Sequence, residues 1–193
     1  FLANTSKIEK EIEKNYALED LKIKTEFPTG LKITIKEKQA KVLLQNSLTQ
    51  LNNEPKNYYY LIDKEGRVIQ EVNPDEINNA AYLALLMLKS QENKNFPINE
   101  TVIAPATVQF LIFLQEKIPA KTAVKLSFVE LADEEGRVVN LTTTEGWRII
   151  MDRQNDWEKQ MQVLTIFLRD KIKDNRQNLH YIDVRYENRS YYR

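Results

Sequence analysis

The side chains that most often carry out catalysis are scarce in this sequence, and those present are not spaced as an active site requires. The 193-residue chain has one histidine, His180, and no cysteine. A serine–histidine–acid triad would depend on His180, which lies in the alternating segment LHYIDVR, and no glycine-elbow serine accompanies it. The glycines, at positions 30, 66, 136 and 146, lie too far apart for a phosphate-binding loop. We therefore expect no catalytic residue, no cofactor and no metal site.

Carboxylates are the remaining candidates for acid–base chemistry. Asp63, Asp152 and Asp183 stand at strand ends or within strands, and we expect them to cap turns or to pair with nearby arginines. An enzyme built on this sequence would have to use a glycosidase-like pair of carboxylates. The sequence favours a protein that binds partners, with such a carboxylate enzyme as an alternative.

Charge and hydropathy bear on other classes of protein. Lys plus Arg and Asp plus Glu both number 28, and the two signs are interspersed in stretches such as KIEKEIEK. Nucleic-acid-binding proteins usually have a net basic face, so we expect no nucleic-acid partner. The longest apolar run, AAYLALLML, is about half the length that spans a bilayer. Because the chain starts with Phe1 rather than Met, we expect further sequence upstream.

The C-terminal stretch YIDVRYENRSYYR, residues 181–193, has chemistry of another kind. Its first half alternates like a β-strand, which predicts that Ile182, Val184 and Tyr186 face a core. A turn at 187–188 would return residues 189–193 as the last strand of a sheet. The outer N–H and C=O groups of such a strand are free to accept a strand from another chain. An ordinary last strand is the alternative, with equal weight.

Several other elements must position this stretch. Each glycine lies between β-rich segments, which predicts four hairpin-type reversals. Helices are predicted at 6–15, 73–90, 104–119 and 155–174, the last with a core-facing stripe that starts at Trp157. Strands are predicted at 19–26, 31–37, 41–45, 57–62, 67–72, 122–131, 137–144, 146–152 and 179–186. The predicted fold class is α+β, with a largely antiparallel sheet and helices packed against it.

Several pieces of the chain resemble the FtsQ/DivIB family of bacterial cell-division proteins. The closing YIDVRY with its short aromatic strand is similar to the family's last motif. KIKTEFPTGLKITIKEK resembles the end of a POTRA domain, and YYYLIDKEGRVIQEV resembles the hairpin that follows it. GWRIIMD and the helix after it are similar to the family's penultimate strand and helix. The resemblance implies that residues 1–41 are the C-terminal part of a POTRA domain and residues 42–193 an FtsQ/DivIB-type β-domain.

The resemblance also implies a function, a location and a set of site residues. The family is a non-enzymatic scaffold of the divisome, to which FtsB/FtsL-type partners bind by adding a β-strand at the C-terminal edge. Arg185 and Tyr186 match the family's Arg–aromatic pair, whereas Arg189, Ser190, Tyr191 and Tyr192 are carried over by position on the edge strand. The implied location is the extracytoplasmic face of the cytoplasmic membrane at the septum, with one transmembrane helix upstream of this chain. The alternative is a POTRA-containing, client-binding module of an outer-membrane assembly or secretion protein.

Overall fold

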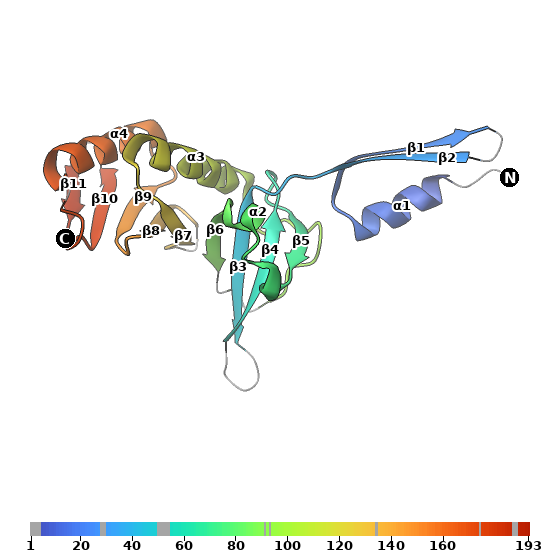
Figure 1. Ribbon diagram of the computed structural model, residues 1–193, viewed down its shortest axis with the longest axis horizontal. Coiled ribbons are helices and arrows are strands. Elements are labelled where there is room, and N and C mark those ends of the chain that lie inside the picture. The colour runs from blue at the N-terminus through green and yellow to red at the C-terminus, as the bar shows by residue number, and fades with distance from the viewer. Residues whose placement is uncertain are drawn as a thin grey trace.

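The strands of the chain form two separate sheets, one of two strands and one of nine (Figure 1). The computed structural model describes residues 5–27, 30–49, 55–90, 92, 94–133, 135–173, 175–186 and 189–193. Residues 38–41 connect the two sheets in an extended conformation. The two sheets and their helices form two parts that lie one after the other along the long axis of the molecule. Strand β11 is at one end and the two-stranded sheet is at the other.

The N-terminal part is small and has little core. It consists of α1 (Thr5–Asn15), β1 (Leu18–Glu26) and β2 (Gly30–Glu37), and β1 and β2 pair antiparallel. Leu21 lies opposite Ile35 and Ile23 opposite Ile33, so these apolar side chains share one face. Every residue of β2 is exposed. The predicted short helix and strand pair are confirmed, while the assignment of this part to a POTRA domain stays a prediction.

The nine-stranded sheet is built from hairpins joined by parallel pairings. Its strands are β3 (Val42–Thr49), β4 (Pro55–Ile62), β5 (Val68–Val72), β6 (Leu86–Ser90), β7 (Leu126–Leu131), β8 (Val138–Thr143), β9 (Arg148–Asp152), β10 (Tyr181–Tyr186) and β11 (Arg189–Tyr192). The order across the sheet is β11-β10-β9-β8-β7-β6-β3-β4-β5. Three contacts are parallel, β9 with β10, β3 with β6 and β6 with β7. The other contacts are antiparallel, so the predicted α+β class with a mostly antiparallel sheet is confirmed.

The predicted glycine turns are also confirmed. Gly30, Gly66, Gly136 and Gly146 each stand at or beside the reversal of an antiparallel strand pair. The last three have positive φ, a backbone conformation that favours glycine.

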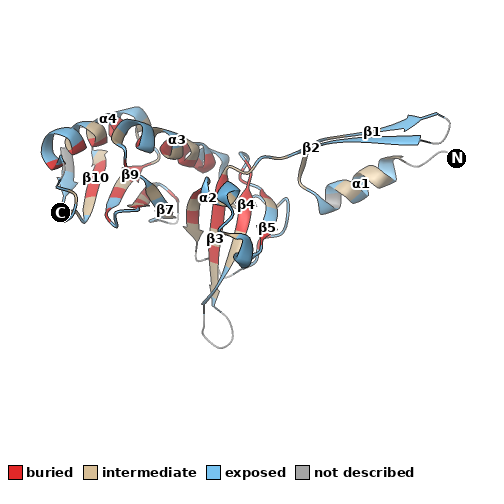
Figure 2. Ribbon diagram, in the orientation of Figure 1, coloured by how far each residue is buried: buried red, intermediate tan, exposed pale blue. Residues whose placement is uncertain are grey.

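The main core lies between one face of this sheet and two helices, α3 (Pro105–Thr122) and α4 (Trp157–Phe167) (Figure 2). A π-helix at Leu168–Ile172 continues α4. The alternating sheet residues Val139, Leu141, Ile149 and Met151 are fully buried under these helices. The predicted stripe of the last helix is confirmed: Met161, Leu164, Leu168 and Ile172 are buried, and the Trp157 ring contacts the rings of Phe110 and Phe113.

The prediction of one long helix at 73–90 is wrong. A 3-10 helix at Pro74–Glu76 and a short α2 (Ala80–Leu83) are followed by strand β6. Asn73 and Asn79 each cap their own turn, through a side-chain oxygen that accepts the backbone N–H of Asp75 and of Ala81. Leu86 and Leu88 are buried with a period of two, because β6 lies inside the sheet between β3 and β7. The helix predicted at 104–119 runs past Pro119 to Thr122.

Candidate functional site

Strand β11 is the last strand of the large sheet, as the sequence predicts, and β10 is its neighbour on one side (Figure 1). Ile182 lies opposite Tyr192 and Asp183 opposite Tyr191. The pairing is irregular between Asp183 and Tyr186. The predicted turn at 187–188 lies outside the residues that the structure describes.

The hydrogen bonds of β11 define which of its backbone groups are free. Arg193 and Tyr181 exchange both backbone hydrogen bonds, at 3.2 and 3.3 Å. Because the groups of successive residues point to opposite sides of an antiparallel strand, Tyr191 also faces β10, and the N–H and C=O of Ser190 and Tyr192 point away from the sheet. Within the described part of the chain, no strand or loop pairs with this outer side.

The other end of the sheet is partly covered. The N–H of Val68 in β5 donates to Glu100 O at 2.9 Å, and the N–H of Asn99 donates to Val68 O at 2.8 Å. Arg67 and Thr101 form an isolated antiparallel bridge beside them. The segment around residues 99–101 therefore occupies part of the β5 edge. Of the two ends of the described sheet, β11 is the one whose outer side has no pairing with any described segment.

Aromatic side chains flank the β11 edge on both faces of the sheet. The ring of Tyr192 contacts the ring of Phe167 in α4, with centroids 5.0 Å apart. The ring of Tyr191 packs edge-on against Tyr186 at 5.7 Å. The four rings therefore place apolar surface on both faces of the sheet beside this edge, while the hydroxyl groups of the three tyrosines tolerate water.

The prediction that Tyr186 faces the core is wrong. Its side chain is 51% exposed, whereas Ile182 and Val184 are buried as predicted. The irregular register between Asp183 and Tyr186 breaks the strict alternation of the strand, so Tyr186 shares the face of Tyr191. Tyr186 is therefore accessible at the surface.

Arg185 is held in place by its own strand. Its Nε donates to Asp183 Oδ1 at 2.9 Å and its terminal nitrogen to Asp183 Oδ2 at 2.7 Å, which makes a two-pronged ion pair. Hydrogen bonding to Asp183, together with the negative charge of that carboxylate, raises the pKa of Arg185 despite its partial burial. Asn155 donates to the backbone oxygen of Arg185 at 2.9 Å. The predicted pairing of Asp183 with an arginine is confirmed, and the guanidinium reaches the surface in a fixed orientation.

Arg185 and Tyr186 line a hollow of about 450 Å³ at the ends of β8, β9 and β10. A second ion pair lies in this hollow, with Arg137 Nε and a terminal nitrogen both 2.8 Å from Asp152 Oδ2. Burial raises the pKa of Asp152, but the hydrogen bonds from Arg137 and the Gln154 N–H, with the charge of Arg137, outweigh it, so the pKa lies below its usual value. The expectation that Asp152 caps a turn or pairs with an arginine is confirmed, since it accepts the Gln154 N–H and pairs with Arg137. Arg137 could not be predicted as this partner from the sequence, because only the pairing of β8 with β9 brings it next to Asp152.

The backbones of Arg189 and Ser190 lie on β11 where the sequence predicts them, and their side chains lie outside the description. The described residues contain no group of three His, Cys, Asp or Glu side chains that could hold a metal ion. Among the described helices, none combines the length and hydropathy needed to cross a membrane.

Comparison with known protein families identifies the chain. A family model described as "Cell division protein FtsQ/DivIB, C-terminal" matches residues 51–185. The chain belongs to the FtsQ/DivIB family. This FtsQ/DivIB-family protein therefore has a role in cell division, in a family of membrane-associated, non-enzymatic scaffold proteins. A comparison with curated proteins gave no match. The matched region includes Arg185 and ends before Tyr186 and β11.

Proposed function

We propose that this FtsQ/DivIB-family chain is a non-enzymatic scaffold of the divisome that accepts a β-strand from an FtsB/FtsL-type partner at the outer edge of β11. The observation that carries the proposal is the pair of outward-facing backbone residues, Ser190 and Tyr192, on a sheet edge that no described segment covers. Main-chain hydrogen bonds to these residues supply affinity that does not depend on the partner's side chains.

Side chains around the edge supply the choice of partner. Successive side chains of an added strand point to opposite faces of the sheet, so one set meets Tyr192 and Phe167 and the other meets Tyr191 and Tyr186. Arg185, fixed by Asp183, adds a cation beside the second set. Truncation of such an aromatic or arginine anchor commonly costs about 1–4 kcal/mol of binding free energy.

We also propose the arrangement of the whole protein. In this arrangement the part that contains α1, β1 and β2 is the end of a POTRA domain, and a transmembrane helix precedes it. The large sheet then stands on the extracytoplasmic side of the cytoplasmic membrane at the division septum. The family match supports a membrane-associated division protein, and the open edge lies at the end of the molecule far from β1 and β2.

The test removes one outward hydrogen-bond donor and leaves the inner ladder intact. Ser190→Pro takes away an N–H that points away from β10, and Ser190→Ala is the matched control that keeps it. We expect Ser190→Pro to weaken binding of FtsB/FtsL-type partners by about 1–3 kcal/mol, about a 5- to 150-fold change, because a partner carbonyl is left unsatisfied. Affinity is measured by titration calorimetry, and stability by thermal unfolding.

Two outcomes decide the proposal. Ser190→Ala should bind like the unsubstituted protein, while Ser190→Pro binds weakly and keeps its thermal stability. Equal affinity of all three proteins, with equal stability, would show that strand addition at β11 does not occur.

A further inference from the structure

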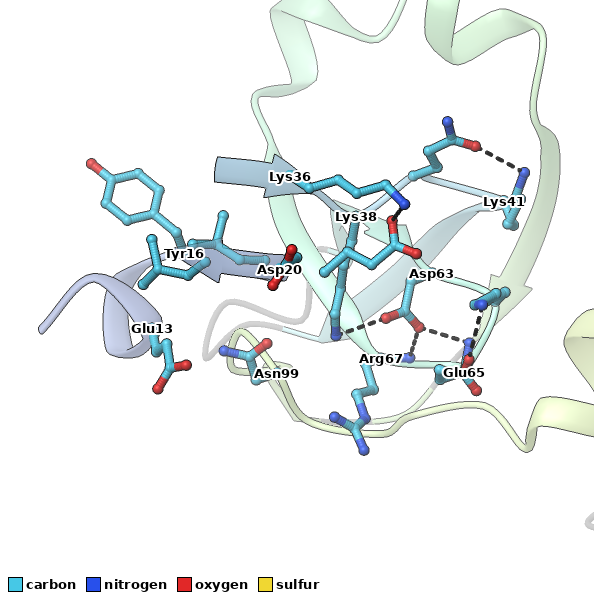
Figure 3. A pocket seen from close by; sticks show the side chains of 15 residues that line it. Glu13, Tyr16, Asp20, Lys36, Lys38, Lys41, Asp63, Glu65, Arg67 and Asn99 are labelled. Carbon is cyan, nitrogen blue, oxygen red and sulfur yellow. Dashed lines mark hydrogen bonds and ion pairs between the residues drawn. The ribbon is translucent and has the colours of Figure 1, made fainter. Parts of the chain in front are cut away.

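One ion pair bridges the two parts of the molecule, next to a cleft between them. The cleft has a volume of about 810 Å³ (Figure 3). Glu13, Tyr16 and Lys36 line it from the N-terminal part, and Asp63 and Arg67 line it from the β4–β5 turn. Since β1 and β2 share no strand pairing with the large sheet, the cleft lies where the relative orientation of the two parts is set.

Lys38 contacts both parts at once. Its backbone N–H points to Ala17 O, between α1 and β1, at 3.5 Å. Its Nζ lies 2.9 Å from Asp63 Oδ2 in the β4–β5 turn, and the two side chains are only 16% and 4% exposed. Because the pair is shielded from water and salt, it holds its geometry more firmly than a surface pair does.

The Asp63 side chain is also held in place by hydrogen bonds that do not involve Lys38. Its Oδ1 accepts the backbone N–H groups of Glu65 and Arg67, both at 2.9 Å, as the predicted turn cap. The far end of the connecting segment is fixed too, since the Lys41 N–H donates to Ile62 O at 2.7 Å. The two parts can therefore move relative to each other only by backbone rotation within residues 38–41. The Lys38 side chain restrains this rotation.

The other ion pairs of the cleft stay within one part. Lys36 in β2 forms a solvent-exposed ion pair with Glu19 in β1, at 2.8 Å. Lys64 lies 3.7 Å from Glu65, and both residues belong to the β4–β5 turn. Lys64 also acts on Glu19 across the cleft through its charge, but the only ion-pair contact that the described residues make between the β4–β5 turn and the chain before β3 is that of Lys38 with Asp63.

We propose that the Lys38–Asp63 pair is a latch that sets the angle between the N-terminal part and the nine-stranded sheet. When the latch is intact, the segment 38–41 holds one conformation and the cleft keeps its shape. When it is released, the N-terminal part swings on this segment while each part keeps its own fold. The latch does not depend on strand addition at β11.

The absence of cysteine makes a direct measurement possible, because introduced cysteines are then the only labelling sites. Spin labels at Lys32→Cys in β2 and Gln109→Cys in α3, both exposed, report the distance between the two parts by double electron–electron resonance. We expect a narrow distribution in the full chain. Lys38→Met should broaden it by up to about 10 Å, the variation that a free segment of this length allows.

Matched variants separate a latch from a general loss of charge. Lys36→Met breaks an ion pair of the same cleft and should leave the distribution narrow, and Lys38→Arg should restore most of the restraint. A distribution that stays narrow in Lys38→Met would overturn the inference. Unfolding of the large sheet in both Lys38→Met and Lys38→Gln, seen by circular dichroism, would overturn it as well, because the pair would then serve folding rather than orientation.

Discussion

At the scale of single residues, exposure separates side chains that support the fold from those that lie free at the surface. Tyr186 and Tyr60 show the contrast within one residue type. Tyr60 in β4 is 1% exposed and packs edge-on against Phe96 at 5.4 Å, whereas half of Tyr186 faces solvent. The same truncation should therefore have opposite consequences at the two positions.

We predict that Tyr186→Ala weakens partner binding by about 1–4 kcal/mol and changes the free energy of unfolding by less than about 0.5 kcal/mol. Tyr60→Ala is the control and should cost about 3–5 kcal/mol of stability, because it opens a cavity in the core. Urea unfolding and titration calorimetry on both variants check this. A stability loss in Tyr186→Ala as large as that in Tyr60→Ala would mean that its ring supports the sheet.

Asp152 gives a pH dependence whose sign follows from its surroundings. The pKa of the folded carboxyl lies below its ordinary value of 3.8, so the unfolded chain binds the proton more readily. The stabilisation is complete above about pH 5, declines as the unfolded carboxyl begins to bind its proton, and is lost as the pH falls through the lower, folded-state pKa. We predict that Asp152→Asn costs about 1–3 kcal/mol at pH 6 and clearly less at pH 3, measured by urea unfolding.

The control for this prediction is Asp170, whose ion pair with Arg169 lies in solvent. Solvent screens an exposed pair, so Asp170→Asn should change stability little at either pH. If Asp152→Asn costs the same at pH 6 and pH 3, the Arg137–Asp152 pair does not provide the stabilisation.

At the scale of elements, the β4–β5 turn depends on one glycine. Gly66 has φ +78°, and a Cβ at this position would lie 1.8 Å from the backbone oxygen of Ile103. The same close approach lets Val102 and Ile103 donate their N–H groups to Gly66 O. Gly66 therefore joins the turn to the segment that leads into α3.

We predict that Gly66→Ala destabilises the protein by about 2–5 kcal/mol, from backbone strain and from displacement of Ile103. Gly146→Ala is the matched control, because Gly146 has φ +93° with no atom within 4 Å of the added Cβ. It should cost only the strain, about 1–2 kcal/mol. Equal costs in chemical denaturation would contradict the close approach at Gly66.

The elements also show what a sequence can specify. Hairpins such as β8–β9 and the α4 stripe were predictable, because turn glycines and helical periodicity are local signals. Strand β6 was not, because its apolar residues Leu86–Leu88 fit a buried helix as well as a buried strand, and only its place between β3 and β7 decides. The edge position of β11 was predictable from the expected turn at 187–188 and the end of the printed sequence, but the outward orientation of Tyr186 depends on an irregular register that leaves no sequence signal.

At the scale of the whole molecule, the order of strands in the sheet could not be predicted from the sequence. Parallel contacts such as β9 with β10 join segments separated by a helix, and nothing local encodes which strands meet. For the same reason the hollow beside Arg185 was missed, since Arg137 and Asp152 come together only in the assembled sheet.

The two parts of the chain should differ strongly in stability. None of the described residues from 5 to 37 is buried, and a two-stranded sheet is only marginally stable by itself. In contrast, Leu141 and Ile149 on the paired central strands β8 and β9 are fully buried. We predict that the amides of β1 and β2 exchange with solvent deuterium long before those of β8 and β9, which open only on global unfolding. Hydrogen exchange followed by mass spectrometry measures both regions in one sample, with α3 as an internal reference for a covered helix. Protection of β1 and β2 equal to that of β8 and β9 would contradict this hierarchy and would show that the N-terminal part folds together with the large sheet.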